Sequence, residues 1–527
     1  MTAYRFLITF CLVATMLMLT PLASVGFADN HEETPASKET DSFEDDEDLS
    51  GFYEEGDDGF SGFDEESDDE SGFGEEGGFG EIEVNLDDID LSATEPSAVT
   101  FGGFIKEEVD YSHAYDDPDY SKIRTTLNLN LDWKIATDWK AKIIWNGFYD
   151  YSYAYRGRDE FNDETLETYE SESELRETFV DGGLTNWFRI KFGRQIIAWG
   201  QSEASQITDV ANPRDLRELG MVDLEDSRVP VTATKLSFLF GSLELNAVAI
   251  HEIRANKIPS EGSEFDLLQD FRISGIVIED EEVPESTGEN TEYLVRLFKT
   301  FNGGDFGIMW ADVYDDYSYL AFHELVTTGS TNFQLTLVPR FKRFTTYGFS
   351  ANMVSGSWLF KTEVARRLGV AIVRSDIETQ VASLLSTSTT YDENSEAIKT
   401  WREKNSHSGM LGVEYTGIQD LTISLEVVGE RIEEYDKEEN LSSKETSAQT
   451  VLSVSYTALN DTFEAGLFWI NFSDNNGDVI RVNLEYDIID ALAVSGGFIN
   501  YHATDEEATV YNYRNNDRVF VSLKYSF

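Results

Sequence analysis

Trp187-Phe-Arg-Ile-Lys-Phe-Gly-Arg-Gln-Ile-Ile-Ala-Trp-Gly200 is a stretch with the residue pattern of a β-strand, and it opens a plan that the chain then repeats. A polar segment with the turn-forming pair Asn212-Pro213 follows it. The strand pattern returns at Val231-Thr-Ala-Thr-Lys-Leu-Ser-Phe-Leu-Phe240. From residue 101 onward the same order of strand, short turn, strand and long polar connection recurs, which predicts an all-β fold of antiparallel hairpins.

Apolar and polar residues alternate along many of these strands, most clearly in Leu127–Lys134, Ile480–Asp487 and Val519–Phe527. A soluble β-sandwich also alternates, with its apolar residues turned inward. Aromatic residues near the predicted strand ends favour a membrane barrel instead, because they occupy the two membrane interfaces of such barrels. These residues are Trp133, Trp139, Trp187, Trp199, Trp358 and Tyr525.

Short turns and long connections alternate regularly along the chain. The short turns lie at residues 136–138, 185–186, 240–242, 302–304, 355–356, 418–419, 459–461 and 488–490. The longer polar connections lie at about 114–120, 156–171, 200–230, 254–290, 320–331, 368–407, 434–447, 474–476 and 503–516. If residues 332–354 form one strand, both chain ends fall on the short-turn side, as in outer-membrane barrels. Residues 99–527 are therefore predicted to form a transmembrane antiparallel β-barrel of about 18 strands, with about 16 as the alternative.

The predicted barrel has a consequence for its interior. Each unsatisfied backbone group in the hydrocarbon costs several kcal/mol, so the sheet must close on itself. A closed barrel of this size leaves a lumen wider than the inward side chains can fill. The sequence therefore predicts an aqueous passage.

Residues 1–28 are predicted to be a secretory signal peptide. An apolar core runs from Phe6 to about Leu22, and small residues favour cleavage after Ala28. The alternative is a transmembrane anchor, against which the helix-breaking Pro21 argues. Beyond this segment no run of about 18 apolar residues predicts a helical span.

The composition of the chain limits the cellular compartments and the binding partners that can be expected. The formal net charge is −60, and so acidic a chain repels the phosphates of nucleic acids. The only cysteine, Cys11, lies in the predicted signal peptide. An exported chain without a thiol cannot form a wrong disulfide, which suits an oxidising compartment.

Residues 29–98 form an acidic zone whose only Lys or Arg is Lys38. Like charges repel, and too little apolar surface is available to offset the chain entropy, so this segment is predicted to be disordered. Ser-Gly-Phe triplets that end in Phe52, Phe63 and Phe73 recur within it. Two interpretations stay open. Either the segment binds a partner through its Phe residues or divalent cations through its carboxylates, or it is a solvated spacer.

Two motifs carry a resemblance to a known family. Gly193-Arg-Gln-Ile-Ile-Ala-Trp-Gly200, followed by Asn212-Pro-Arg-Asp215, resembles a family of proteobacterial outer-membrane β-barrels of unknown function that are described as porin-like. Pro339–Phe341, Gly348–Ser350 and Trp358–Ala365 are similar to the mid-barrel hairpin of that family. The resemblance covers about residues 100–527 and implies a barrel held in the lipid of the bacterial outer membrane. It implies no substrate.

The end of the chain carries a second, more general resemblance. The last predicted strand ends on Phe527, which resembles the C-terminal signal that the outer-membrane assembly machinery reads. The resemblance implies this machinery as a partner.

The connection at 200–230 is the strongest candidate for a functional site, because it is long and carries both signs of charge. Its charged residues include Asp209, Arg214, Asp215, Arg217, Glu218, Asp223, Glu225, Asp226 and Arg228. If the loop folds into the lumen, its arginines opposite carboxylates set up a transverse field that sorts ions by charge. The alternative is a solvated external loop in which Asn212-Pro213 merely makes a turn.

Residues on the polar face of the strand at 187–199 are predicted to line the lumen. They are Arg189, Lys191, Gly193 and Gln195. Arg194 falls on the lipid-facing side, so it lies either at the membrane interface or on a bulge near Gly193 that turns it inward. The bulge is favoured, because a lipid-facing Arg at mid-membrane costs about 2–4 kcal/mol.

Lys361 and Glu363 share one face of the strand that starts at Trp358. They are predicted to form an ion pair in the lumen. Arg366 and Arg367, at the outer end of that strand, are predicted to lie at the mouth of the barrel.

Catalysis has little support. The six His residues show no metal-binding spacing such as His-Glu-x-x-His, and there is no Gly-x-Ser-x-Gly elbow. We therefore expect no enzyme, cofactor or metal site.

Three functions stay open. The first is passive diffusion of small hydrophilic solutes, with a preference for cations because carboxylates are in excess. The second is a plugged barrel that acts as an interaction or surface protein through its acidic segment and loops. The third is a barrel that exports apolar compounds together with an inner-membrane transporter. A homo-oligomer stays open in each case.

Overall fold

The computed structural model describes residues 98–527, apart from 114–118, 223–226, 267–274, 328–331, 386–388, 394, 396, 474–476, 506–507 and 509. The predicted signal peptide 1–28 lies outside the described residues. The same holds for the predicted acidic segment 29–98, except for Ala98.

Eighteen strands form one antiparallel sheet that closes on itself, because β22 pairs with β1 as well as with β21. The barrel strands are β1 (Val99–Ser112), β2 (Asp119–Ala136), β3 (Trp139–Asp150), β4 (Ser171–Thr185), β5 (Phe188–Gln195), β6 (Val231–Phe240), β7 (Leu243–Ile250), β9 (Glu292–Phe301), β10 (Gly304–Tyr314), β13 (Arg343–Ser355), β14 (Trp358–Val373), β16 (Trp401–Ile418), β17 (Leu421–Ile432), β18 (Thr446–Ala458), β19 (Phe463–Phe472), β20 (Gly477–Ile489), β21 (Leu492–Ala503) and β22 (Arg518–Ser526). The predicted barrel of 18 strands is confirmed, and the alternative of 16 is wrong.

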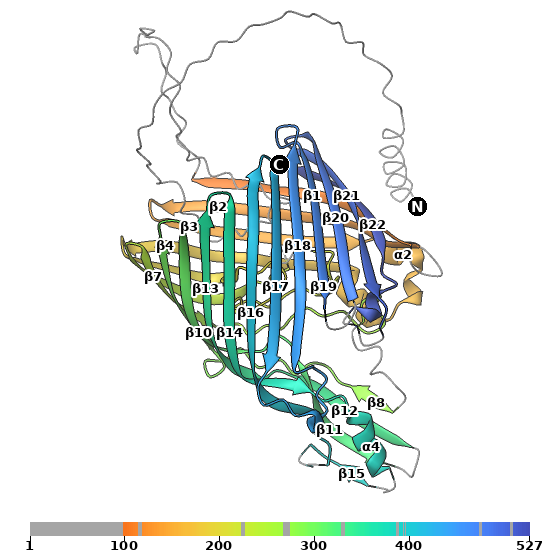
Figure 1. Cartoon of the computed structure of the whole chain (residues 1–527). Helices are drawn as coiled ribbons and strands as arrows, with labels where there is room; N and C mark the ends of the chain where they lie inside the picture. Colours follow the sequence, from red (N-terminus) through yellow and green to blue (C-terminus); the bar gives the residue numbers. More distant parts are fainter. Residues whose placement is uncertain are drawn as a thin grey trace, which may run out of the picture. The chain divides into compact units, whose positions relative to one another are not determined.

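Short turns lie at one end of the barrel and long connections at the other (Figure 1). Every predicted short turn joins two consecutive barrel strands. Both ends of the barrel sequence lie at the short-turn end. There Phe527 N donates to Gly103 O at 2.9 Å, and Gly103 N donates to Phe527 O at 3.0 Å. These two hydrogen bonds extend the seam between the first and last strands.

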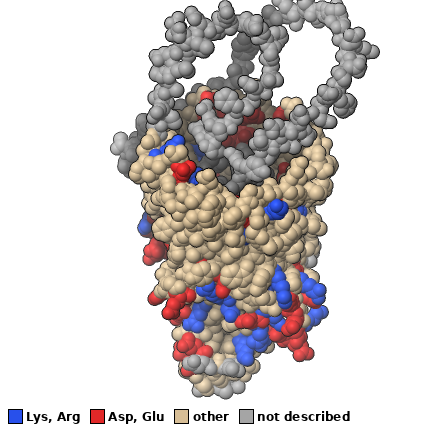
Figure 2. All heavy atoms as spheres, turned by 90° about the vertical axis from the view of Figure 1, so that its left-hand side faces the viewer, with Lys and Arg blue, Asp and Glu red and all other residues tan. Residues whose placement is uncertain are grey.

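The outside of the barrel is apolar, as predicted. Successive side chains of a strand point to opposite faces, and those that point outward stay exposed, among them Ile308, Phe360, Leu411 and Val521. Figure 2 shows a broad band of this surface with few charged side chains, which gather instead toward the long-connection end. Soluble proteins rarely expose so much apolar surface, whereas a membrane barrel requires it.

Exposed aromatic residues mark the short-turn end of the outer surface. Trp133, Trp187, Trp358 and Tyr525 are all about half exposed there. Trp199 is an exception, since only 5% of it is exposed. Its predicted place at a membrane interface is wrong, because the chain has already left β5 and turned into the barrel when it reaches this residue.

A second sheet, which the sequence did not predict, lies at the long-connection end (Figure 1). It consists of β8 (Ile276–Ile278), β11 (Tyr319–Thr327), β12 (Phe333–Arg340) and β15 (Thr390–Tyr391), and helix α4 (Ile377–Leu384) packs on it. Among the described residues, no helix has both the length and the apolar character to cross a membrane.

Two predicted segments are wrong because of this sheet. Residues 332–354 are not one strand, since β12 ends at Arg340 and joins the outer sheet, while β13 starts at Arg343 in the barrel. Residues 320–331 are not a polar connection, since most of them form β11. The physical reason is a small apolar core, in which β11 and β12 bury residues such as Leu325 and Leu335 against α4.

Candidate functional site

Residues 196–230, which connect β5 to β6, lie inside the barrel, and we call them the lumen loop. Of its described residues, only Ala198 and Val222 are exposed, and none belongs to a strand or helix. Its hydrogen bonds and ion pairs reach inward side chains of β14, β17 and β18 on one wall and of β2 and β21 on another. The loop therefore crosses the lumen from wall to wall.

Glu363 on β14 holds the first part of the lumen loop. Its carboxylate accepts hydrogen bonds from Thr208 N at 3.1 Å and Thr208 Oγ1 at 3.0 Å. It also accepts one from the backbone N of Gln201. One carboxylate thus satisfies two backbone donors of a segment that has no strand partner, and such charge-assisted bonds are stronger than neutral ones.

Lys361, two residues earlier on the same inward face, binds the loop through carboxylates. Its Nζ lies 3.1 Å from Oε1 of Glu203 in the loop and 3.1 Å from Oε1 of Glu426 on β17. The predicted ion pair between Lys361 and Glu363 is therefore wrong: both side chains face the lumen, but each has its own partners in the loop.

The lumen loop has an ionic centre of its own. Asp209 Oδ2 lies 3.0 Å from Nε of Arg228 and also pairs with Arg214. Burial favours the neutral carboxyl, but Arg228 and Arg214 outweigh it and keep the pKa of Asp209 below its ordinary value. Because the Arg214 side chain is only 1% exposed, it cannot act on a permeating ion by contact. This pair holds the loop fold.

Asp215 and Arg217 tie the loop to the connection between β3 and β4. Arg217 Nε donates to Asp215 Oδ1 at 2.9 Å, and its Nη2 lies 2.7 Å from Oε2 of Glu172 on β4. Arg217 O accepts a hydrogen bond of 2.9 Å from Tyr169 in helix α3 (Asp163–Tyr169).

Glu218 makes the contact with the opposite wall. Its Oε2 lies 2.5 Å from Lys122 Nζ, and its Oε1 lies 2.8 Å from Arg124 Nη2, both on β2. Burial opposes ionisation, but Arg124 and Lys122 outweigh it and lower the pKa of Glu218 to about 2. Lys122 and Arg124 were not predicted as site residues from the sequence. Both residues occupy even-numbered positions on β2, on the face opposite Leu127 and Leu129. This alternation could have indicated that both side chains point into the barrel.

Glycine permits the close approach of the next loop residues to this wall. Gly220 has a φ of +76°, and a Cβ on it would lie 2.9 Å from Ile499 Cδ1 on β21. Tyr501 on the same strand donates a hydrogen bond to Leu219 O.

Part of the wall formed by β6, β7, β9, β10, β13 and β14 is apolar inside as well as outside. Trp199, Val210 and Ala211 of the loop pack on inward residues such as Val248 and Leu294 in one buried cluster. A lumen with polar faces throughout is therefore not what the structure has. These strands are covered by the loop instead of water, which explains why they carry apolar residues on both faces.

Three predicted lumen residues of β5 do face inward. Arg189 Nη2 lies 3.1 Å from Asp181 Oδ1, and Lys191 Nζ lies 3.8 Å from the centre of the Phe179 ring. Gln195 is buried and donates to Ala233 O at 3.0 Å.

Arg194 faces outward, on the same side as the 55% exposed Phe192. The pairing of β5 with β4 and with β6 runs through Gly193 without a register shift, so the predicted bulge is wrong. Arg194 lies at the long-connection end of its strand and pairs with Glu252. At the membrane edge this ion pair avoids the energetic cost of a charge in the hydrocarbon. This position corresponds to the second predicted possibility, an Arg194 at the membrane interface.

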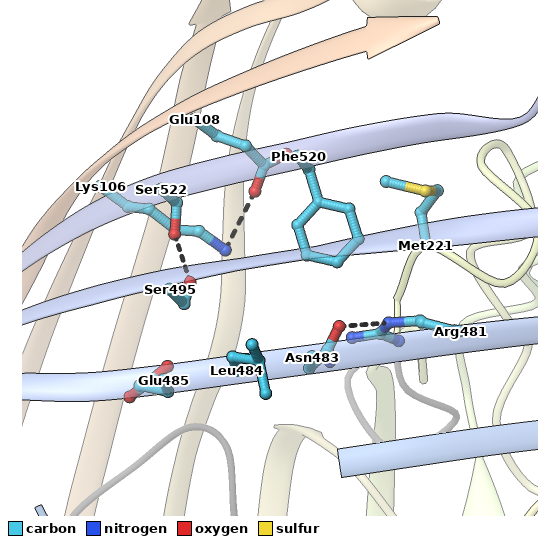
Figure 3. Close-up of a pocket in the computed structure, with 10 residues that line it drawn as sticks. All are labelled: Lys106, Glu108, Met221, Arg481, Asn483, Leu484, Glu485, Ser495, Phe520 and Ser522. Atoms are coloured by element: carbon cyan, nitrogen blue, oxygen red, sulfur yellow. Dashed lines mark hydrogen bonds and ion pairs between the residues drawn. The ribbon is translucent and has the colours of Figure 1, made fainter. Parts of the chain in front are cut away.

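A polar pocket remains between the lumen loop and the wall of β1 and β20–β22 (Figure 3). We call it the turn-side pocket. Its residues include Lys106, Glu108, Arg481, Asn483, Ser495 and Ser522, with Met221 of the loop at one side. Lys106 Nζ lies 3.1 Å from Glu108 Oε2, and Arg481 Nε donates to Asn483 Oδ1 at 3.1 Å.

A second pocket, the loop-side pocket, lies nearer the long-connection end. Its residues include Lys122, Arg124, Arg156, Glu218, Glu264 and Arg518, together with aromatic residues of α3 and the neighbouring connections. Within the described ranges, no three His, Cys, Asp or Glu side chains are placed to hold a metal ion.

These features define a porin-like barrel, a closed 18-stranded antiparallel sheet crossed by an internal loop. Residues 115–527 match the family described as "Protein of unknown function (DUF1302)", and the chain belongs to this family. No match was found among curated proteins.

Several solved outer-membrane barrels are similar in structure. Acinetobacter baumannii OccAB4 has a TM-score of 0.44 at 9% identity, over 82% of this chain and 99% of that one. Pseudomonas aeruginosa OpdK has a TM-score of 0.43 at 8% identity, over 81% and 98%. The outer-membrane channel DcaP of Acinetobacter baumannii has a TM-score of 0.37 at 13% identity, over 81% and 97%.

Proposed function

We propose that this protein is a channel of the bacterial outer membrane through which small hydrophilic solutes diffuse passively. The observation that carries the proposal is the turn-side pocket: a charged and polar space inside a barrel whose outside is apolar. A closed barrel of 18 strands is wide enough to hold water. The lumen loop fills the side next to β6–β14, so the passage runs along β1 and β20–β22.

Channel activity is tested by reconstituting the purified, refolded chain in planar bilayers. We expect discrete steps of conductance, since the polar wall offers ions a hydrated path. A bilayer that stays sealed at every voltage would contradict the proposal.

The route of the passage can be tested with single cysteines, because Cys11 lies in the predicted signal peptide. In Ser495→Cys, a charged thiol reagent is expected to lower the conductance, since this side chain lines the turn-side pocket. Val494→Cys is the matched control, because Val494 pairs with Leu523 on the lipid-facing side. Equal effects of the reagent on both variants would argue against this route.

We also propose that the channel prefers cations. Three carboxylates, those of Glu108, Asp110 and Glu218, surround Lys122 at the narrow part of the route. The chain as a whole is acidic, with a formal net charge of −60. In a salt gradient the reversal potential is expected to favour the cation, and a preference for chloride would contradict this.

The second candidate is a plugged barrel that serves as an interaction or surface protein. The contacts of the lumen loop with several walls and the additional outer sheet favour it. A peptide of residues 29–98 used as bait, compared with the same peptide in which each Phe is changed to Ser, tests docking by the acidic segment. Equal recovery of binding proteins would argue against this function. Export of apolar compounds has less support, since the apolar side of the lumen is filled by the loop itself.

We further propose that Phe527 acts as the assembly signal of the barrel. Its backbone closes the seam to Gly103, and its ring lies 6.2 Å from that of Phe101. Deletion of Phe527 is expected to lower the amount of folded barrel in the membrane fraction, measured by heat-modifiable mobility on gels. Phe101→Ala, which removes only the ring contact, is the control. Equal yields from the deletion and the natural chain would contradict an assembly role.

A further inference from the structure

The two pockets of the lumen meet at one ion-pair group. Glu108 lines the turn-side pocket, whereas Glu218 lines the loop-side pocket. Between them, Lys122 Nζ lies 2.8 Å from Glu108 Oε1 and 2.5 Å from Glu218 Oε2. Arg124 Nη2 holds the other oxygen of Glu218 at 2.8 Å. A solute that moves from one pocket to the other along this wall has to pass this group.

Only one member of the group belongs to the lumen loop and not to a barrel strand. Lys122, Arg124 and Glu108 belong to β1 and β2, which pair with each other from the pair of Val99 with Trp133 to the pair of Ser112 with Asp119. Glu218 belongs to the lumen loop and has no strand partner. Displacement of Glu218 therefore opens the boundary between the pockets without any change in the barrel.

We propose that Glu218 is the gate and the charge-selecting residue of the passage, an inference that rests on the proposed channel function. While its carboxylate bridges Lys122 and Arg124, the route between the pockets is closed or narrow, and both cations are neutralised. When the carboxylate is removed, the route widens, and Lys122 and Arg124 each lose one negative partner. Lys122 keeps Glu108 and Asp110, and Arg124 keeps Asp150. The route then carries one negative charge less, so its preference for cations over small inorganic anions falls.

The test compares Glu218→Gln with the natural chain and with Asp215→Asn in planar bilayers. Both variants remove one carboxylate from the same loop, but Asp215 lines neither pocket, and Arg217 keeps Glu172 as its partner. Glu218→Gln is expected to raise the conductance and to shift the reversal potential toward chloride. Asp215→Asn is expected to keep the values of the natural chain. Glu218→Asp, which retains the charge, is expected to keep the cation preference.

Each outcome decides between the proposals. If the natural chain is sealed and Glu218→Gln conducts, the gate stands and the open channel is wrong. If the natural chain conducts and Glu218→Gln behaves identically, the gate is wrong and the channel stands. The gate is also wrong if both stay sealed, or if Asp215→Asn gives the same shift as Glu218→Gln. Heat-modifiable mobility on gels shows that each variant has folded.

Discussion

Replacement of Lys361 by Met is expected to release the lumen loop from the wall of β14 and β17 and to raise the conductance strongly. The Lys361 side chain is 5% exposed and lies between the carboxylates of Glu203 and Glu426, which are 7% and 0% exposed. Loss of one partner from a buried ion pair costs about 3–5 kcal/mol, because it leaves a buried charge without compensation. Here two carboxylates would be left, and Glu203 can reach water only if the loop moves away.

Limited proteolysis and bilayer recording together measure this release. In Lys361→Met, a protease is expected to cut within residues 201–208, which the natural chain protects by burial. The control adds Glu203→Gln and Glu426→Gln to Lys361→Met, which removes both unpaired charges and is expected to restore protection of the loop. A loop that is as protected in Lys361→Met as in the natural chain would show that Lys361 does not hold it.

The second large effect concerns the outside of the barrel. Leu411 on β16 is 71% exposed and points away from the lumen, in register with Thr362 and Val427. Leu411→Arg is expected to destabilise the barrel by about 2–4 kcal/mol, the cost of an Arg on the lipid face near mid-membrane. The measurement is the denaturant midpoint of unfolding from lipid vesicles.

An inward substitution two strands away is the matched control. Ser455 on β18 has the same parity as the buried Val451 and Ser453, which face the lumen. Ser455→Arg is expected to cost much less, because a lumenal Arg stays hydrated. If both variants lose the same stability, the assignment of the two faces is wrong.

Strand order and topology were predictable from local pattern alone. Each barrel strand has one face in lipid, so its apolar residues repeat every second position. Every short turn interrupts this repeat within a few residues. A segment such as Ile480–Asp487 therefore reveals its outward face directly, because Ile480, Val482, Leu484 and Tyr486 all turn to lipid in the structure, as its alternation indicates.

The prediction was incomplete where strands are buried on both faces. β11 and β12 pack against α4 and form a separate sheet that was not predicted. β6, β7, β9 and β10 were predicted as strands, but the packing of their inward apolar residues against the lumen loop was not. Pro339 within β12 was an available signal, because proline is rare inside the central strands of a sheet. Its presence argued against one long strand at 332–354.

The candidate site was predictable in its location but not in its partners. The length and the mixed charge of residues 200–230 predicted a functional loop. The alternation of apolar and polar residues along their strand predicted that Lys361 and Glu363 point into the lumen. Which carboxylate each cation meets depends on contacts between residues far apart in the sequence, such as Glu218 with Lys122. No local pattern encodes such a pairing. The role of these residues in solute selection stays a prediction.

The one-sided packing of the lumen loop has a consequence for the size of solutes. A pore diameter calculated from strand number assumes that the whole cross-section is water. Here the side next to β6, β7, β9 and β10 is occupied by Trp199 and its neighbours. In the proposed channel, the sieving limit would therefore be set by an off-axis space along β1 and β20–β22. The pore diameter can be measured from the largest polymer that still enters the channel. We expect it to be far smaller than the diameter calculated from the 18 strands.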